Sequence, residues 1–131
     1  MTGLDTNVLL RFFLQDDPLQ SPKADRIIGS LTLNEPGWVG AAAILELVWV
    51  ISSQNRIGRT RIAAILGQLL TRDEIVIEQA DVVQNALQLY RKGNTEFSDC
   101  LIASSAKAAG CSRTVTFDRK AARDAGMQLI G

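Results

Sequence analysis

Four acidic residues lie at positions that suit a catalytic or metal-binding carboxylate better than an ordinary solvated one. Asp5 and Asp118 each follow a short apolar stretch that predicts a β-strand and precede a predicted helix. Asp99 lies in the first turn of another predicted helix, in the segment FSDCLIASSA. Glu46 is the one charged residue of the segment AAAILELVWVI, which predicts a helix that is apolar on all sides and therefore buried. An ionised carboxylate there costs roughly several kcal/mol unless it is paired or binds a metal.

Each of these acids also has a purely structural explanation. Asp5 and Asp118 are able to cap the helix that follows them, and Asp99 favours the dipole of its helix. Glu46 is able to form a salt bridge with an arginine. The carboxyl ends of parallel strands and the starts of the following helices meet at one edge of a sheet, where ligands bind in such folds. We therefore predict that the four carboxylates converge in a single acidic site.

The residue types that the chain lacks narrow the chemistry of that site. The sequence contains no histidine, which excludes a Ser-His-Asp triad, HExxH zinc chemistry and any imidazole general base. Its two cysteines, Cys100 and Cys111, have no CxxC spacing and are expected to be reduced. Clustered carboxylates raise one another's pKa and need a counter-charge, and their hard oxygen atoms select Mg²⁺ or Mn²⁺. Such an ion at the end of a sheet indicates phosphoryl-transfer chemistry with metal-activated water.

The elements that position these acids follow from length, composition and periodicity. With 131 residues, 47% hydrophobic and 21% charged, the chain predicts one folded domain over residues 1–131. Short apolar strands alternate with amphipathic helices, which predicts an α/β fold with a mainly parallel sheet and helices on both faces. We expect strands at residues 2–4, 38–39, 75–77, 114–116 and 127–130. We expect helices at residues 8–14, 21–31, 41–53, 60–70, 98–109 and 119–124, and one capped by Asp81 that runs to Lys92.

Net charge and hydropathy limit the classes of partner that the chain is expected to bind. Fourteen basic and fourteen acidic residues give no net charge, so any contact with a nucleic acid must come from a local patch. Arg11 and Arg119 are the leading candidates for binding a nucleic acid because they closely follow Asp5 and Asp118. Further basic candidates are Arg56, Arg59, Arg61, Lys120 and Arg123. The longest apolar run, Val39 to Ile51, is too short to span a bilayer, and we expect a soluble, cytoplasmic protein without a membrane partner.

Apolar residues near the acids have two alternative roles. Phe12, Phe13, Trp49 and the stretch from Ile62 to Leu70 supply more apolar surface than one small core needs. These side chains either pack in the core or form a groove for a helix of a partner protein.

Four segments carry a resemblance to a known family: GLDTNVLLR, ILELVWVI, FSDCLIA and TVTFDRKAA. In this order and spacing the chain resembles, over essentially its whole length, PIN-domain proteins of the VapC toxin type found in toxin–antitoxin modules. The resemblance implies a three-layer α/β/α sandwich with a mainly parallel sheet of about five strands. It also implies an Mg²⁺- or Mn²⁺-dependent endoribonuclease that is inhibited by an antitoxin protein and forms a homodimer. By motif position the catalytic and metal-binding quartet is Asp5, Glu46, Asp99 and Asp118.

The same resemblance suggests supporting residues and a substrate. Thr6, Asn7 and Thr116 match polar positions beside the acids. Glu96 departs from the pattern, since many relatives carry Asp there; it either joins the outer part of the site or is solvated. The substrate is expected to be a structured RNA with an exposed loop, such as a tRNA.

Two other interpretations compete with this one. A phosphatase of the haloacid dehalogenase type would use Asp5 as a nucleophile, but it needs an acid in place of Asn7 and an acidic pair beside Asp99 that the chain lacks. A catalytically inactive PIN fold would act only as a binding module, although all four acids are present. Metal titration combined with a nuclease assay separates these interpretations.

Overall fold

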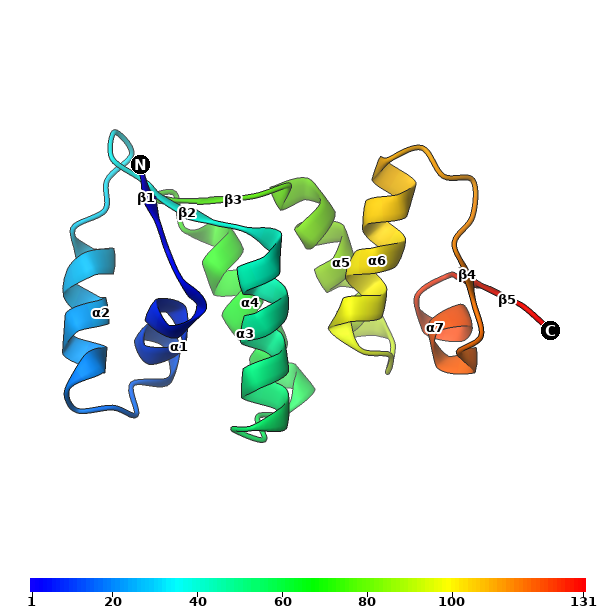
Figure 1. Ribbon diagram of the computed structural model, residues 1–131, viewed down its shortest axis with the longest axis horizontal. Coiled ribbons are helices and arrows are strands. Elements are labelled where there is room, and N and C mark those ends of the chain that lie inside the picture. The colour runs from blue at the N-terminus through cyan, green and yellow to red at the C-terminus, as the bar shows by residue number, and fades with distance from the viewer. The chain divides into compact units, whose positions relative to one another are not determined.

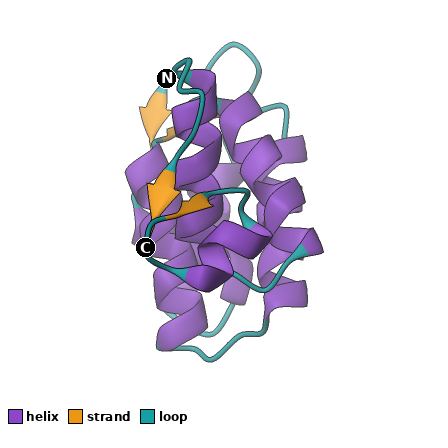
Figure 2. Cartoon of the chain, turned by 90° about the vertical axis from the view of Figure 1, so that its right-hand side faces the viewer, coloured by secondary structure: helices purple, strands orange, loops and turns teal.

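The computed structural model describes residues 1–131, and its contacts divide the chain into two compact units, Met1–Glu78 and Gln79–Gly131. Both combine α-helices with short parallel strands, as Figures 1 and 2 show. The expected single domain over residues 1–131 stays a prediction.

The first unit contains a three-stranded parallel sheet in the order β1-β2-β3. Its strands are β1 (Thr2–Gly3), β2 (Gly37–Val39) and β3 (Ile75–Ile77). Hydrogen bonds extend the sheet past the ends of β1 and β3. The Leu4 N–H donates to the Trp38 carbonyl at 2.8 Å, and the Glu78 N–H donates to the Val39 carbonyl at 2.9 Å. The carboxyl ends of all three strands are therefore fixed side by side, and the residues that follow them start at the same edge.

Four helices accompany this sheet: α1 (Thr6–Leu14), α2 (Gln20–Gly29), α3 (Ala41–Ser53) and α4 (Arg59–Thr71). Helix α1 packs against α2 and α3, and α3 packs against α4, as Figure 1 shows. Strand β2 alternates, with Gly37 and Val39 buried and Trp38 partly exposed. The core is aliphatic, and its fully buried members include Leu9, Ile44, Leu47, Ile51, Ile62, Leu66 and Leu69.

The second unit consists of α5 (Ala80–Lys92), α6 (Phe97–Ala108), β4 (Val115–Thr116), α7 (Arg119–Asp124) and β5 (Gln128–Leu129). Helices α5 and α6 lie side by side, and the rings of Tyr90 and Phe97 meet edge to face at 5.7 Å. Strands β4 and β5 form a parallel pair against which α7 packs. A small core beside this pair is made of Ala121, Ala125 and Met127, with Ala103 packed against it.

The predicted α/β class with about five parallel strands is confirmed, and the predicted bounds of α3, β3 and α7 are the observed ones. The five strands do not form one hydrogen-bonded sheet, since three pair in one set and two in another. The prediction that Asp81 caps α5 is wrong, because the cap position is held by Gln79 in a left-handed conformation with φ 51°. Asp81 lies instead in the first turn of that helix. None of the helices has the length and apolar character that a membrane span requires.

Candidate active site

A pocket of about 370 Å³ lies at the carboxyl edge of the β1-β2-β3 sheet and contains two of the predicted catalytic acids, Asp5 and Glu46. The two residues are 41 positions apart in the sequence. They share the pocket because β1 leads into Asp5, while the neighbouring strand β2 leads into the helix that carries Glu46. The complete lining is Leu4, Asp5, Thr6, Trp38, Gly40, Ala42, Ala43, Glu46 and Glu78.

Asp5 caps α1 as well as lining the pocket. Its Oδ1 atom accepts a hydrogen bond of 2.8 Å from the backbone N–H of Thr6, which confirms the structural explanation for this residue. The other carboxylate oxygen has no protein donor, so capping leaves Asp5 able to bind a cation. Thr6 is buried in the pocket wall. Asn7, the other predicted supporting residue here, lines a different groove between α1 and α2.

Glu46 is exposed, which corrects the expectation that α3 is buried on all sides. The helix buries Ile44, Leu47, Val48 and Ile51, and its opposite stripe, which contains Glu46 and Trp49, faces outward. The sequence hides this stripe because its other members are alanine and tryptophan rather than charged residues. Glu46 forms no salt bridge, so an arginine partner does not account for it.

Glu78 is a third acid in this pocket that the sequence analysis missed. It follows β3 directly, and its Oε1 atom accepts a hydrogen bond of 2.8 Å from the backbone N–H of Ala41, the first residue of α3. The signal that would have found it is the one applied to Asp5 and Asp118, namely an acid immediately after a short apolar strand.

Asp99 is held by a threonine that the sequence analysis also missed. The Oγ1 atom of Thr95 donates a hydrogen bond of 2.7 Å to Oδ2 of Asp99, and Thr95 is only 1% exposed. Asp99 is half-buried in the first turn of α6, as predicted. Glu96 occupies the cap position of that helix, is exposed, and makes no capping hydrogen bond with its side chain.

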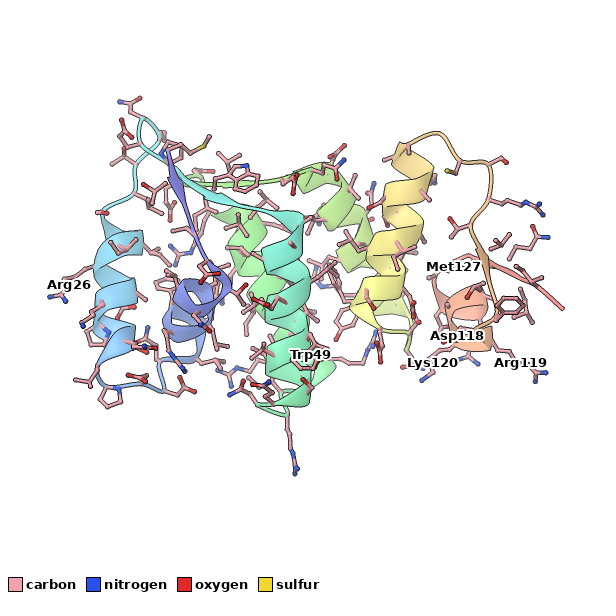
Figure 3. All side chains as sticks on the ribbon, viewed as in Figure 1. Arg26, Trp49, Asp118, Arg119, Lys120 and Met127 are labelled. Atoms are coloured by element: carbon pink, nitrogen blue, oxygen red, sulfur yellow. The ribbon has the colours of Figure 1, made fainter.

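Asp118 caps α7 by accepting hydrogen bonds from two backbone groups, the N–H of Lys120 at 2.8 Å and that of Ala121 at 3.0 Å. The Oγ1 atom of Thr116 in turn accepts a hydrogen bond of 3.0 Å from the N–H of Asp118. Thr116 therefore lies beside Asp118, as predicted. Figure 3 shows Asp118 at the start of α7, with the side chains of Arg119 and Lys120 extending outward from the helix.

The structure therefore brings Asp5 and Glu46 together in the first unit and places Asp99 and Asp118 in the second. No three acidic or thiol side chains gather closely enough to enclose a metal ion. The donor set nevertheless suits a hard cation, because the carboxylates of Asp5 and Glu46 share a pocket with no basic residue in its lining. Convergence of all four acids stays a prediction.

The two leading RNA-binding candidates differ in their surroundings. The guanidinium of Arg11 donates to Oε1 of Gln20 at 2.8 Å and forms an ion pair with Asp16 at 3.3 Å. Arg119 is exposed and forms no ion pair. The structure thus leaves the charge of Arg119 more available to a phosphate than that of Arg11.

Most of the apolar surface considered for a partner belongs to the core. Ile62, Ile65, Leu66 and Leu69 of α4 are all buried. The half-buried rings of Phe12 and Phe13 pack edge to face at 5.1 Å. The side chain of Trp49 on α3, labelled in Figure 3, is the exception at 60% exposed.

Comparisons with known proteins support the family resemblance that the four acid-bearing sequence segments indicated. The PIN domain family matches residues 4–126. The chain is also similar to a protein of Aquifex aeolicus (strain VF5) described as a VapC ribonuclease, with 28% identity over 121 residues that cover 92% of this chain and 89% of that protein. The matched residues contain all four predicted catalytic acids and the strands β2, β3 and β4. The chain belongs to the PIN domain family, whose fold is of the three-layer α/β/α class.

Proposed function

We propose that this protein is an endoribonuclease that depends on Mg²⁺ or Mn²⁺ and acts as the toxin of a toxin–antitoxin module. The observation that carries the proposal is the pocket at the sheet edge, which Asp5 and Glu46 both line and which has no basic residue in its lining. Carboxylates that share a pocket without a protein cation supply the oxygen ligands that Mg²⁺ and Mn²⁺ prefer. The similarity to a VapC ribonuclease and membership in the PIN domain family support the same activity.

In this proposal Asp5, Glu46, Asp99 and Asp118 hold the metal ion. A bound divalent ion lowers the pKa of a coordinated water and offsets the negative charge of a phosphodiester. Asp5 and Asp118 are fixed by the helix caps they form, and Asp99 is fixed by its hydrogen bond from Thr95. Such restraint keeps the carboxylates in place before the substrate arrives, which reduces the reorganisation that the reaction requires. By resemblance the products carry a 5′-phosphate and a 3′-hydroxyl.

The proposed partners follow from the same assignment. The substrate is an RNA with an unpaired loop, and a tRNA is the first to test. An antitoxin protein inhibits the enzyme, the protein forms a homodimer, and it acts in the cytoplasm. Arg119, next to the capping residue Asp118, is proposed to contact an RNA phosphate.

The experiment that tests this function combines calorimetric Mn²⁺ binding with an RNA cleavage assay. The wild-type protein is expected to bind Mn²⁺ and to cleave RNA, and EDTA is expected to abolish cleavage. Asp5→Asn is expected to weaken Mn²⁺ binding, since a neutral amide replaces a carboxylate. Equal Mn²⁺ affinity in the wild type and in Asp5→Asn would remove Asp5 from the site. Mn²⁺ binding without cleavage of any cellular RNA would favour an inactive PIN fold that only binds.

A further inference from the structure

Glu78 lies in the pocket with Asp5 and Glu46 but matches none of the acids assigned above. Its backbone position is fixed, because its N–H donates to the Val39 carbonyl at 2.9 Å and so continues the β2–β3 ladder by one residue. Its side chain crosses to α3, where Oε1 accepts a hydrogen bond of 2.8 Å from the N–H of Ala41. One residue thus ties the end of β3 to the start of the helix that carries Glu46.

The start of α3 has no capping side chain of its own. Its cap position is Gly40, which offers no hydrogen-bond acceptor beyond its backbone. The first turn of any helix leaves backbone N–H groups without partners in the helix, and a capping acceptor normally stabilises that turn. A carboxylate at this end also interacts favourably with the helix dipole. Glu78 supplies both the acceptor and the charge.

A local cap is disfavoured by the packing around Gly40. A Cβ atom at this position would lie 3.0 Å from Cη2 and 3.2 Å from Cζ3 of the Trp38 ring, closer than side chains normally approach. Serine, threonine or aspartate, the usual capping residues, would therefore require the indole to move. The same Cβ would lie 3.6 Å from Oε1 of Glu78, which shows how closely the carboxylate approaches this turn.

Glu46 lies five residues after Ala41, which is about 7.5 Å along the helix axis. Fraying of the first turn would free the residues between the cap and Glu46, including Ala42 and Ala43, which line the pocket themselves. We propose that Glu78 is a positioning residue: it caps α3 from the neighbouring strand and thereby holds the Glu46 carboxylate in the pocket with Asp5. The inference rests on the proposed function, in which the Glu46 carboxylate binds the metal ion and must therefore be held in the pocket.

Two conservative variants separate the cap from the charge. Glu78→Gln keeps a side-chain oxygen at the same reach and removes the negative charge. Glu78→Asp keeps the charge but is one methylene shorter, so that it no longer reaches the Ala41 N–H. The control is Glu35→Ala, which removes an exposed glutamate that precedes β2, at the other end of the sheet, and with it only an exposed ion pair with the N-terminal ammonium at 3.3 Å. The full chain is used throughout, at a temperature well below the melting temperature of every variant.

The first measurement needs no metal and no substrate: amide hydrogen exchange at Ala41, followed by NMR. Exchange is expected to be about tenfold faster in Glu78→Asp, at most about twofold faster in Glu78→Gln, which loses only the smaller contribution of the charge, and unchanged in Glu35→Ala. The second measurement is Mn²⁺ affinity together with kcat and KM for RNA cleavage. Glu78→Asp is expected to weaken Mn²⁺ binding and lower kcat about fivefold or more with little change in KM. Glu78→Gln is expected to stay within about twofold of the wild type.

The results that overturn the inference are distinct from those that reject the proposed function. If Glu78→Gln is as defective as Glu78→Asp, or more so, the charge matters and the cap does not. If both variants match the wild type in amide exchange, or in Mn²⁺ affinity and kcat, Glu78 does not position Glu46. A wild-type protein that neither binds Mn²⁺ nor cleaves RNA rejects the proposed function, and with it the task assigned to Glu78.

Discussion

The hydroxyl of Thr95 donates a hydrogen bond of 2.7 Å to the carboxylate of Asp99, from a position that is almost completely buried. The donor precedes α6, and the acceptor lies in the first turn of that helix. A buried donor has few rotamers, so this bond fixes the direction of a carboxylate that is otherwise half-exposed.

Replacing Thr95 with valine, which has nearly the same shape, is therefore expected to impair activity without unfolding the protein. Loss of the hydrogen bond is expected to lower stability by about 1 kcal/mol and kcat by about tenfold, because the Asp99 carboxylate loses its restraint. Thr95→Ser keeps the hydroxyl and is the control, expected to retain most of the activity. The measurements are thermal melting and RNA cleavage. A Thr95→Val protein with wild-type kcat would show that the bond has only a structural role.

Asp118 permits a clean separation of its two roles. Asparagine is as good a helix cap as aspartate, so Asp118→Asn is expected to keep the stability of the wild type. Asp118→Ala loses the hydrogen bonds from Lys120 and Ala121 and is expected to cost about 1 kcal/mol. RNA cleavage is expected to fall sharply in both variants, because neither has a carboxylate at this position. Full activity in Asp118→Asn, measured beside its melting curve, would reduce Asp118 to a cap.

Arg119 and Arg11 are expected to differ in their effect on RNA binding. Arg119→Ala removes an exposed charge and is expected to raise KM about fivefold and to reduce the salt dependence of binding by about one phosphate contact. Arg11→Ala is expected to change KM less, since its guanidinium is already bonded to Gln20 and Asp16. Arg26→Ala, an exposed arginine of α2 labelled in Figure 3, serves as the control for lost surface charge. If all three variants raise KM equally, no local patch is present.

Asp124 predicts a pH dependence of stability. The hydrogen bond from Arg123, together with that from the Asn94 N–H, holds the pKa of the Asp124 carboxyl below its ordinary value of 3.8. The folded protein therefore binds this proton less readily than the unfolded chain. The contribution of Asp124 to stability is fully present above about pH 5 and is lost as the pH falls through 3.8 toward the lower folded value.

The corresponding measurement compares melting temperatures of the wild type and Asp124→Asn between pH 7 and pH 3. The wild type is expected to melt higher at pH 7, and the difference is expected to shrink as the pH falls below about 4. A difference that stays constant over this range would contradict the assignment of the lowered pKa to this carboxyl.

The sequence was sufficient to locate the elements and the acids at their ends, because strand-to-helix junctions are marked by local composition. Asp5 and Asp118 cap the helices that follow them, as their positions predicted. Glu78 follows β3 in the same way and was missed although this local signal marks it. Its role as a cap of α3 has no local signature, because its partner Ala41 is 37 residues away and the contact arises only when β2 and β3 pair.

Three other differences have local causes. The exposed stripe of α3 was invisible because alanine and Trp49 occupy it, so hydropathy alone predicted burial on all sides. Strands β4 and β5 contain only two residues each, and so short a ladder gives no sequence pattern that specifies its neighbours. The ion pair of Arg11 depends on the turn after α1, where Gln15 adopts a left-handed conformation and brings Asp16 within reach.

The central claim is that carboxylates and a divalent ion cleave RNA, and the most direct test lets the cell supply the substrate. The wild type and Asp99→Asn are expressed at equal levels, and new RNA 5′ ends are mapped across the transcriptome. The wild type is predicted to arrest growth and to produce 5′-phosphorylated ends concentrated at one sequence in an exposed loop, while Asp99→Asn produces none. Identical profiles of RNA ends for the two proteins would contradict the claim. Ends produced by cleavage that leaves a 2′,3′-cyclic phosphate would contradict it as well.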